Sequence, residues 1–242
     1  MNLIVDIGNS FAKLAVFQND ELVEKWVVES DKLHEKIFEI FSNGILEAAI
    51  VSNVSKTAFS WPDDMKGKIH LMQLSAHTPL PFQNRYATPD TLGNDRKALA
   101  AAASQQYGNR NVLVIDAGTC ITYDIKTDKN EYLGGGISPG LKMRFKALNT
   151  FTANLPLIEF KKKFEAIGNT TPGSIVSGVE MGFVCEVDGM IQTYKNQFDD
   201  LMIIITGGDA QFLSINLKNS IFANSNFLLE GLNYILEFNN SQ

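Results

Sequence analysis

The fold is decided by two similar stretches of sequence, IVDIGNS at residues 4–10 and VIDAGTC at residues 114–120. Each runs from apolar residues through an aspartate to a glycine and then to an amide or hydroxyl side chain. Each also leads into another β-rich stretch, residues 12–17 and 121–125. A single Asp-x-Gly is a common hairpin turn. Two copies in matched contexts, 110 positions apart in a chain of 242, indicate two similar halves.

The residues around these stretches predict mixed α/β halves, which we place at 1–110 and 111–242. In the first half, apolar runs and alternation predict strands at 2–6, 11–17, 21–28, 48–51 and 69–74. Helices are expected at 31–41, where apolar side chains share one face, and at 95–106, which is rich in alanine. The stretch 53–65 is polar and irregular, and we leave it unassigned.

The second half predicts strands at 112–116, 120–125 and 202–206, with a further strand at 131–133 running into a glycine cluster. We expect that cluster, residues 134–136, to be a loop. Helices are predicted at 138–149, with Pro139 at the first helical position, and at 173–194. Residues 227–238 read as a final amphipathic helix.

Composition and charge exclude several classes of protein. Hydrophobic residues make up 45% of the chain and charged residues 20%, which is typical of a globular protein. The net charge is −6 and no basic cluster stands out, so we expect no nucleic-acid partner. The two cysteines lack CxxC spacing, which argues against a disulfide scaffold or a thiolate zinc site.

The sequence also argues against a membrane protein. No uninterrupted apolar run approaches the length of a membrane span. Asp6 interrupts the apolar start before a signal-peptide core could form. We therefore expect a cytoplasmic protein with no membrane partner.

The two Asp-x-Gly turns have features that suit phosphate binding. Glycine lets the backbone approach a phosphate, and successive N–H groups in a turn form an anion-binding concavity. The aspartate carries the same charge as a phosphate, so we expect it to hold a cation or the water shell of one. Lys13 follows the first turn and could reach back to a phosphate; the alternative is an ordinary exposed lysine.

The segment GNDR at residues 93–96, just before the alanine-rich helix, suggests a substrate site. Gly93 suits a tight turn, and Asn94 or Thr91 could cap the helix. Asp95 and Arg96 then fall in the first helical turn, where free N–H groups favour an anion. Asp95 could accept a hydrogen bond from a substrate hydroxyl, and Arg96 offers a planar fork for a carboxylate or amide. For an isolated Asp-Arg pair, a purely structural role is the more common explanation.

A third glycine turn, TGGD at residues 206–209, follows a buried strand and could let an adenine ring lie against bare backbone. The order of two phosphate turns and then a nucleotide-base turn resembles the superfamily of actin, hexokinase and the heat-shock chaperones. That resemblance implies an α/β fold of two duplicated ribonuclease-H-like, actin-like ATPase domains with a nucleotide cleft between them. No Walker-type phosphate loop is present.

Within that superfamily the sequence resembles the type III pantothenate kinase family. The family pattern runs D-x-G-N-[ST], then Y…G-x-D-R, D-A-G-T, G-G-x-I-x-P-G, a distal N-T…S-G, and T-G-G-D. This chain supplies its counterparts in the same order: DIGNS at 6–10, Tyr86 with GNDR at 93–96, DAGT at 116–119, GGGISPG at 134–140, TT at 170–171 before SG at 177–178, and TGGD at 206–209.

The resemblance implies ATP-dependent phosphorylation of the primary hydroxyl of pantothenate, giving 4′-phosphopantothenate, the first step of coenzyme A biosynthesis. It makes Asp95 the proton acceptor, places Thr119 on ATP, and gives Asp116 a monovalent cation, potassium or ammonium. Magnesium is expected with ATP. The other ATP-binding residues implied are Asp6, Ile7, Gly8, Asn9, Ser10, Phe11, Ala12 and Lys13.

The family pattern also implies a pantothenate site and a homodimer. The residues implied for pantothenate are Tyr86, Gly93, Asn94, Asp95, Arg96 and Thr171. Thr171 is the better candidate of the adjacent pair Thr170 and Thr171, and its contact could cross the homodimer interface. Residues 143–151 carry an apolar stripe that fits either such an interface or a core face.

Two other functions remain open from the sequence. The chain could be a nucleotide-binding regulatory protein that keeps the fold without turnover, which would predict ATP binding with no phosphorylated product. It could also be a kinase for another small hydroxylated acid or sugar. The presence of both Asp95 and Arg96 favours pantothenate phosphorylation.

Overall fold

The computed structural model describes residues 1–8, 11–55, 58–159 and 165–241 and divides the chain into two compact units. The first unit comprises Met1–Gly108, Asn130–Tyr132 and Asn226–Gln242, and the second comprises Asn109–Lys129 and Leu133–Ser225. The first division lies close to the expected boundary at residue 110. The C-terminal stretch, which we expected in the second half, belongs instead to the first unit.

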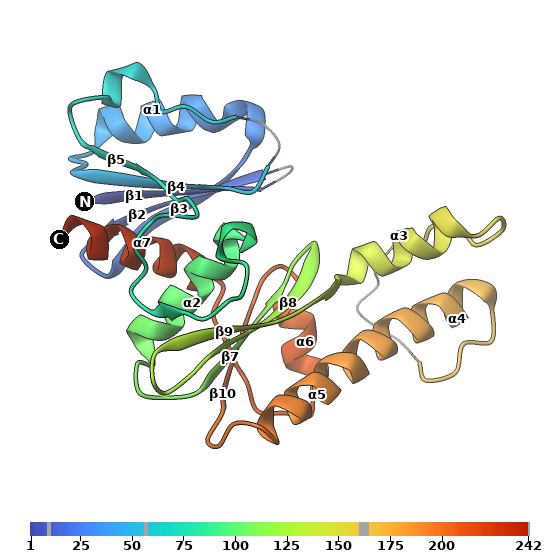
Figure 1. Ribbon diagram of the computed structural model, residues 1–242. Coiled ribbons are helices and arrows are strands. Elements are labelled where there is room, and N and C mark those ends of the chain that lie inside the picture. Colours follow the sequence, from blue (N-terminus) through green and yellow to red (C-terminus); the bar gives the residue numbers. More distant parts are fainter. Residues whose placement is uncertain (9–10, 56–57, 160–164, 242) are drawn as a thin grey trace. The chain divides into compact units, whose positions relative to one another are not determined.

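The first unit is built on a five-stranded sheet with the order β3-β2-β1-β4-β5 (Figure 1). β1 lies in the middle, antiparallel to β2 and parallel to β4, and all six of its residues are buried. The five expected strands are all present, and two residues that are not part of this sheet form the additional β6. The bounds are β1 Asn2–Ile7, β2 Phe11–Gln18, β3 Glu21–Glu29, β4 Ala48–Asn53, β5 His70–Gln73 and β6 Gln83–Asn84.

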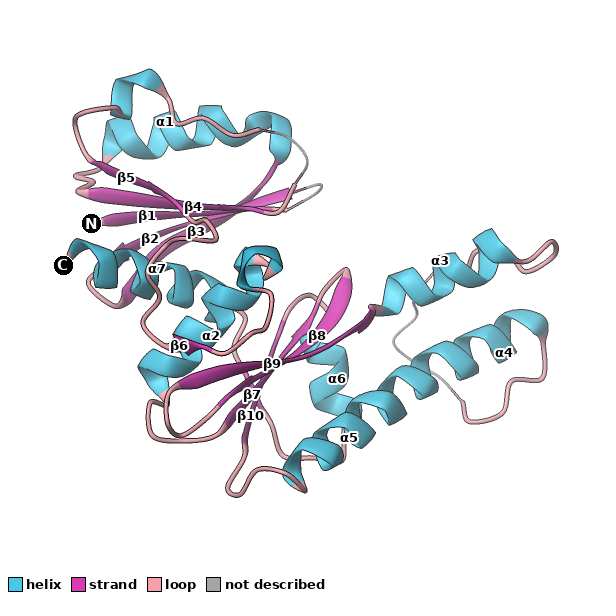
Figure 2. Cartoon of the chain, viewed as in Figure 1, coloured by secondary structure: helices cyan, strands magenta, loops and turns pink. Residues whose placement is uncertain are grey.

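Helices cover both faces of this sheet (Figures 1 and 2). α1 (Leu33–Asn43) packs its apolar stripe against Leu3, Val5 and their neighbours on one face. α7 (Phe227–Asn240) contacts β1 and β4 on the other face, and α2 (Asn94–Gln106) packs against α7. Short 3-10 helices occur at Ser30–Lys32, Asp63–Met65 and Pro89–Thr91. Because side chains alternate along a strand, Ile4 and Asp6 lie on the face opposite α1.

The place of α7 explains why the C-terminus joins the first unit. Its buried residues include Leu229, Leu232 and Leu236, which cover the second face of the sheet. Polar contacts add to this packing, because Asn2 on β1 donates a 2.9 Å hydrogen bond to Asn233. The second apolar face of the sheet at β1 is covered by residues more than 220 positions later in the chain. No local sequence pattern predicts such a contact.

The second unit has its own sheet, with β11, β10, β7, β8 and β9 in that order (Figure 2). The apolar face of this sheet, which includes Leu113, Ile121 and Ile203, forms one core with residues of α3, α4, α5 and α6. The strand bounds are β7 Val112–Ala117, β8 Cys120–Lys126, β9 Glu131–Pro139, β10 Met202–Thr206 and β11 Phe222–Ala223. The helices are α3 Leu141–Phe151, α4 Thr171–Val176, α5 Gly182–Lys195 and α6 Ala210–Asn216. A π-helical segment, Ser177–Met181, connects α4 to α5.

Two of the expected elements in this unit were wrong. The glycine cluster 134–136 is not a loop but lies in the interior of β9. A β-carbon at Gly135 would collide with the carbonyl of Tyr123, which explains the glycine at that position in the strand. The helix expected from Ser138 begins only at Leu141. Pro139 ends β9, and Gly140 stays extended because its N–H donates to Thr119 O at 3.2 Å.

Within the part of the chain that the structure describes, no helix is both long enough and apolar enough to cross a membrane.

Candidate active site

Asp6 stands at the end of β1, where the first phosphate turn begins. Its carboxylate is 8% exposed and accepts a 3.2 Å hydrogen bond from the Ser52 hydroxyl on β4. Lys13 on β2 is its direct partner across the antiparallel pair. Ser52 was not identified from the sequence, because its role depends on β4 lying beside β1.

Burial raises the pKa of Asp6 from 3.8 to about 6. Lys13 and the Ser52 hydrogen bond oppose this shift, whereas the negative charge of Asp95 adds to it. Since Asp6 and Asp95 interact electrostatically, the structure brings the first phosphate turn and the candidate proton acceptor into one charged region of the first unit. A carboxylate held in this way is poised to receive a cation or a cationic side chain.

Replacing Asp6 with asparagine is expected to stabilise the fold while harming function. A pKa raised from 3.8 to about 6 means that ionised Asp6 costs about 3 kcal/mol of folding free energy at neutral pH. The free energy of unfolding of the wild type, compared with that of Asp6→Asn, is highest below pH 4, where Asp6 is protonated in both the folded and the unfolded state. It falls as the pH rises to about 6, because ionisation then favours the unfolded state. Chemical denaturation from pH 3.5 to 7.5 measures this difference. Asp31→Asn, at an exposed carboxylate of the same unit, controls for charge, and a pH-independent difference would contradict the prediction.

The turn after Asp6 is closed by a backbone hydrogen bond from Gly8 N to Phe11 O at 3.0 Å. A β-carbon at Gly8 would lie 3.1 Å from the same oxygen, so a glycine fits this tight approach. Ile7 and Ala12 are buried supports of the turn, and Phe11 is exposed. Asn9 and Ser10, which we expected to contact ATP, lie outside the described residues.

Asp95 and Arg96 occupy the first turn of α2, as expected. The Asp95 carboxylate folds back over Gly93 and accepts a 2.8 Å hydrogen bond from Arg96 N. A β-carbon at Gly93 would collide with that carboxylate. Glycine at residue 93 therefore leaves room for the Asp95 side chain in this position at the helix N-terminus.

The Arg96 side chain is held among aromatic rings. It is 4% exposed, and its guanidinium carbon lies 5.6 Å from the centre of the Tyr86 ring and 6.0 Å from that of Tyr132. The two tyrosine rings are 6.2 Å apart. This arrangement fixes the guanidinium plane, which a bidentate contact with a substrate requires. Tyr132 was missed from the sequence because it enters from β9, far along the chain.

The start of α2 is anchored differently from our expectation. Neither Asn94 nor Thr91 caps the helix; Gly93 is the N-cap, and the side chain that bonds a free N–H of the first turn is that of Asp95. Asn94 instead donates to Leu74 O at 3.0 Å. The buried ammonium of Lys97 donates to Ser75 O at 3.0 Å, so two side chains tie the start of α2 to the segment after β5.

In the second unit, Asp116 and Thr119 lie at the turn between β7 and β8. Gly207, in the turn after β10, has a φ of +92°, and a β-carbon there would collide with the Asp116 carboxylate and the Ala117 carbonyl. Asp209 N donates to Ala117 O at 3.0 Å, which joins the two turns. The second phosphate turn and the TGGD turn thus form one loop cluster.

Burial also raises the pKa of Asp209, and nearby Lys142 at the start of α3 opposes the shift. Among the described residues, no group of three or more histidine, cysteine, aspartate or glutamate side chains forms a metal cluster. Asp116 and Asp209 both belong to the loop cluster, and the Asp116 carboxylate lies close to the backbone of Gly207.

Thr171 lies elsewhere in the second unit, as the first residue of α4. Thr170 is the N-cap, and its hydroxyl accepts a 3.1 Å hydrogen bond from Gly173 N. Thr171 is exposed and lines a groove between α3 and α4. Both threonines are exposed and line the groove, but the hydroxyl of Thr170 is engaged in the cap.

Comparisons with known proteins decide the family. A sequence profile described as type III pantothenate kinase matches residues 2–193. The chain belongs to the type III pantothenate kinase family. It is 54% identical to the type III pantothenate kinase of Christiangramia forsetii over the full length of both chains. It is 46% identical to that of Flavobacterium johnsoniae, with 98% of each chain covered.

Solved structures show the same fold for this family member. A putative Baf family transcriptional activator from Campylobacter jejuni aligns with a TM-score of 0.64 at 22% identity, covering 99% of this chain and all of the other. An inorganic polyphosphate/ATP-glucomannokinase from an Arthrobacter strain aligns with a TM-score of 0.52 at 12% identity over both full chains. The expected fold of two ribonuclease-H-like domains is confirmed, and identities this low carry nothing beyond the fold.

Proposed function

We propose that this chain transfers the γ-phosphoryl group of ATP to the primary hydroxyl of pantothenate, with Asp95 as the proton acceptor. The products are 4′-phosphopantothenate and ADP, and the reaction is the first step of coenzyme A biosynthesis. Membership of the type III pantothenate kinase family supports the reaction. The single observation that supports the site is the pair formed by Asp95 at the N-terminus of α2 and the buried Arg96 beside it.

The proposed step forms a bond between the pantothenate oxygen and the γ-phosphorus and breaks the bond from that phosphorus to the β–γ bridging oxygen. The hydroxyl proton passes to the Asp95 carboxylate, and ADP leaves with the bridging oxygen. Phosphoryl transfer runs through a loose transition state, so positioning of the hydroxyl contributes more than a strong base would. The close fit of Asp95 over Gly93 supplies such positioning.

Arg96 is the proposed anchor for the polar groups of pantothenate. A guanidinium held beside the rings of Tyr86 and Tyr132 can present two parallel donors to a carboxylate or amide. Asn94 and Gly93 complete the part of the substrate site that lies in the first unit. Thr171 is assigned to the same substrate from a second copy of the chain.

ATP is assigned to the two phosphate turns. Residues 6–13 would surround the phosphates, with Lys13 as the cation that reaches them from β2. Thr119 would contact ATP from the turn between β7 and β8. Magnesium would arrive with ATP and be held through phosphate oxygens and water, because it keeps much of its hydration shell in proteins.

Asp116 is the proposed ligand of a monovalent cation, potassium or ammonium. The Asp116 carboxylate supplies a negative charge, and the neighbouring carbonyl of Ala117 is a neutral oxygen donor, which are the kinds of oxygen that hard cations prefer. When bound, that cation would offset the charge of the phosphates. The chain's own contribution is to hold the carboxylate still between Gly118 and Gly207.

The test is product formation from ATP and pantothenate by the purified chain, in potassium, ammonium or sodium chloride. Phosphopantothenate that appears only with potassium or ammonium supports the reaction and the cation site together. ATP binding without product identifies a regulatory protein instead. A panel of hydroxylated acids and sugars separates the third possibility, because one of them would then outcompete pantothenate.

We also infer that the chain forms a homodimer through α3 and α4. These helices border an apolar groove of about 1410 Å³ that includes Met143, Phe151 and Thr171. Phe151 is 85% exposed and Met143 is also exposed, although Phe145 of the same stripe is buried in the core. A second copy of the chain would cover this apolar surface and place its Thr171 near the substrate of the first.

Phe151→Asp is expected to convert the dimer into a monomer, because the substitution places a charge in the apolar face. Light scattering after size-exclusion chromatography measures the mass. The monomer should also show a KM for pantothenate about ten-fold higher, since Thr171 would lose its partner. Ile215→Asp, at a 74% exposed residue of α6 away from the groove, is the matched control. A wild-type chain that is monomeric at micromolar concentration would contradict the inference.

A further inference from the structure

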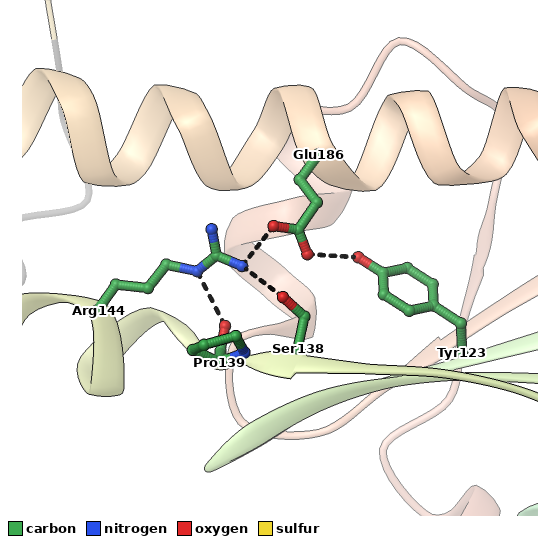
Figure 3. Close-up of polar contacts among 5 residues, drawn as sticks. All are labelled: Tyr123, Ser138, Pro139, Arg144 and Glu186. Atoms are coloured by element: carbon green, nitrogen blue, oxygen red, sulfur yellow. Dashed lines mark hydrogen bonds and ion pairs between the residues drawn. The ribbon is translucent and has the colours of Figure 1, made fainter. Parts of the chain in front are cut away.

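Arg144, in the first turns of α3, makes an unusual number of polar contacts for a half-buried side chain (Figure 3). Its Nε donates to Pro139 O at 2.8 Å. One terminal nitrogen donates to Ser138 Oγ at 3.1 Å and to Glu186 Oε2 at 2.5 Å. The guanidinium also lies 5.0 Å from the centre of the Phe183 ring. Arg144 therefore joins the end of β9 to α5.

The position of Glu186 is itself fixed. Its other carboxylate oxygen accepts a 3.3 Å hydrogen bond from the hydroxyl of Tyr123 on β8, as Figure 3 shows. Burial and the Glu186 charge raise the pKa of Tyr123, so the phenol keeps the proton that it donates. Arg144 and Glu186 are 20% and 28% exposed, and water screens such a pair less than a surface pair.

The residues that Arg144 holds adjoin the second phosphate turn. Gly140 directly follows Pro139, and its N–H donates to Thr119 O at 3.2 Å. A β-carbon at Gly140 would collide with the carbonyl oxygens of Gly118 and Thr119. A shift of the Pro139–Gly140 backbone would therefore move Gly118 and Thr119, since no space separates them.

We propose that Arg144 is a positioning residue for the second phosphate turn: by holding Pro139 against α5 it keeps Gly140, and through it Gly118 and Thr119, in the geometry that receives ATP. This inference rests on the assignment of that turn to ATP under the proposed function. Arg144 lies outside both phosphate turns, on α3, the helix that borders the apolar groove. A residue that merely stabilised α3 would leave the geometry of ATP binding unchanged.

The test compares Arg144→Met and the isosteric Glu186→Gln with Lys146→Met, an exposed cation on the same helix. Calorimetry with ATP and potassium, without pantothenate, should give a Kd about ten-fold weaker for Arg144→Met, in the range found when a partner of a ligand-binding group is removed. Glu186→Gln should weaken ATP binding in the same direction, Arg144→Lys should restore part of it, and Lys146→Met should match the wild type. The KM for pantothenate should stay within about two-fold in all four.

Several outcomes would overturn the inference. One is an unchanged Kd for ATP in both Arg144→Met and Glu186→Gln; Glu186→Gln keeps this decisive even if Arg144→Met folds poorly. Another is an equal loss of ATP affinity in Phe151→Asp, because the effect would then come from the groove and not from the turn. If the wild type itself binds no ATP, the proposed function fails instead, so the two failures are distinguishable.

Discussion

Asp95→Asn is expected to lower kcat about 10³-fold, the range in which a positioned proton acceptor contributes to catalysis. Asparagine keeps the size of the side chain and can still accept a hydrogen bond from Arg96 N, but it cannot take the proton of the substrate hydroxyl. The KM values for ATP and pantothenate should change by no more than about three-fold, since the shape of the site is preserved.

The measurement is steady-state formation of phosphopantothenate, with a melting temperature and an ATP-binding isotherm for each variant. Asp90→Asn is the matched control, because Asp90 is an exposed acid of the neighbouring 3-10 helix. It should keep the wild-type rate. Full activity in Asp95→Asn would remove Asp95 as the proton acceptor while leaving the family assignment in place.

Gly207→Ala should be the most damaging change in the loop cluster of the second unit. Gly207 has a φ of +92°, a conformation that costs alanine about 1–2 kcal/mol. Its new methyl group would also collide with the Asp116 carboxylate and with the Ala117 backbone. Because the Asp116 side chain and the backbone at residue 207 must both move, we expect a loss of about 10²-fold in kcat/KM.

The displacement of Asp116 gives this variant a specific signature. The potassium concentration needed for half-maximal activity should rise together with the loss of activity, because Asp116 is the proposed cation ligand. Gly189→Ala is the control, since a β-carbon there meets nothing within 4 Å on α5. An unchanged potassium dependence in Gly207→Ala would separate Asp116 from the cation.

Much of the fold could be predicted from local sequence, because strands and helices follow from the spacing of apolar residues. The duplicated Asp-x-Gly turns predicted the end of β1 and of β7, and Asp95 and Arg96 occupy the first turn of α2 as expected. The glycines at 134–136 were misread as a loop. Gly135 is a glycine because β9 runs against the backbone of Tyr123 there, a contact between strands that no local pattern encodes.

The site was predictable in the same limited sense. Residues inside a motif, such as Gly93 and Asp95, were identified from their neighbours in the chain. Ser52 and Tyr132 were not, because each reaches its partner only after strands distant in sequence come together. Arg144 belongs to this second group, since its partners lie on α5 and at the end of β9.

The packing of α7 in the first unit affects how the protein folds during its synthesis on the ribosome. β1 is synthesised more than 200 residues before α7, yet one face of its sheet waits for that helix. At roughly 5–20 residues per second, that interval lasts on the order of ten seconds or more. The second unit, whose residues are synthesised in between, has all of its strands available earlier. The first unit therefore starts before the second unit and is completed after it, and a nascent chain that still lacks α7 leaves an apolar sheet face open to chaperones.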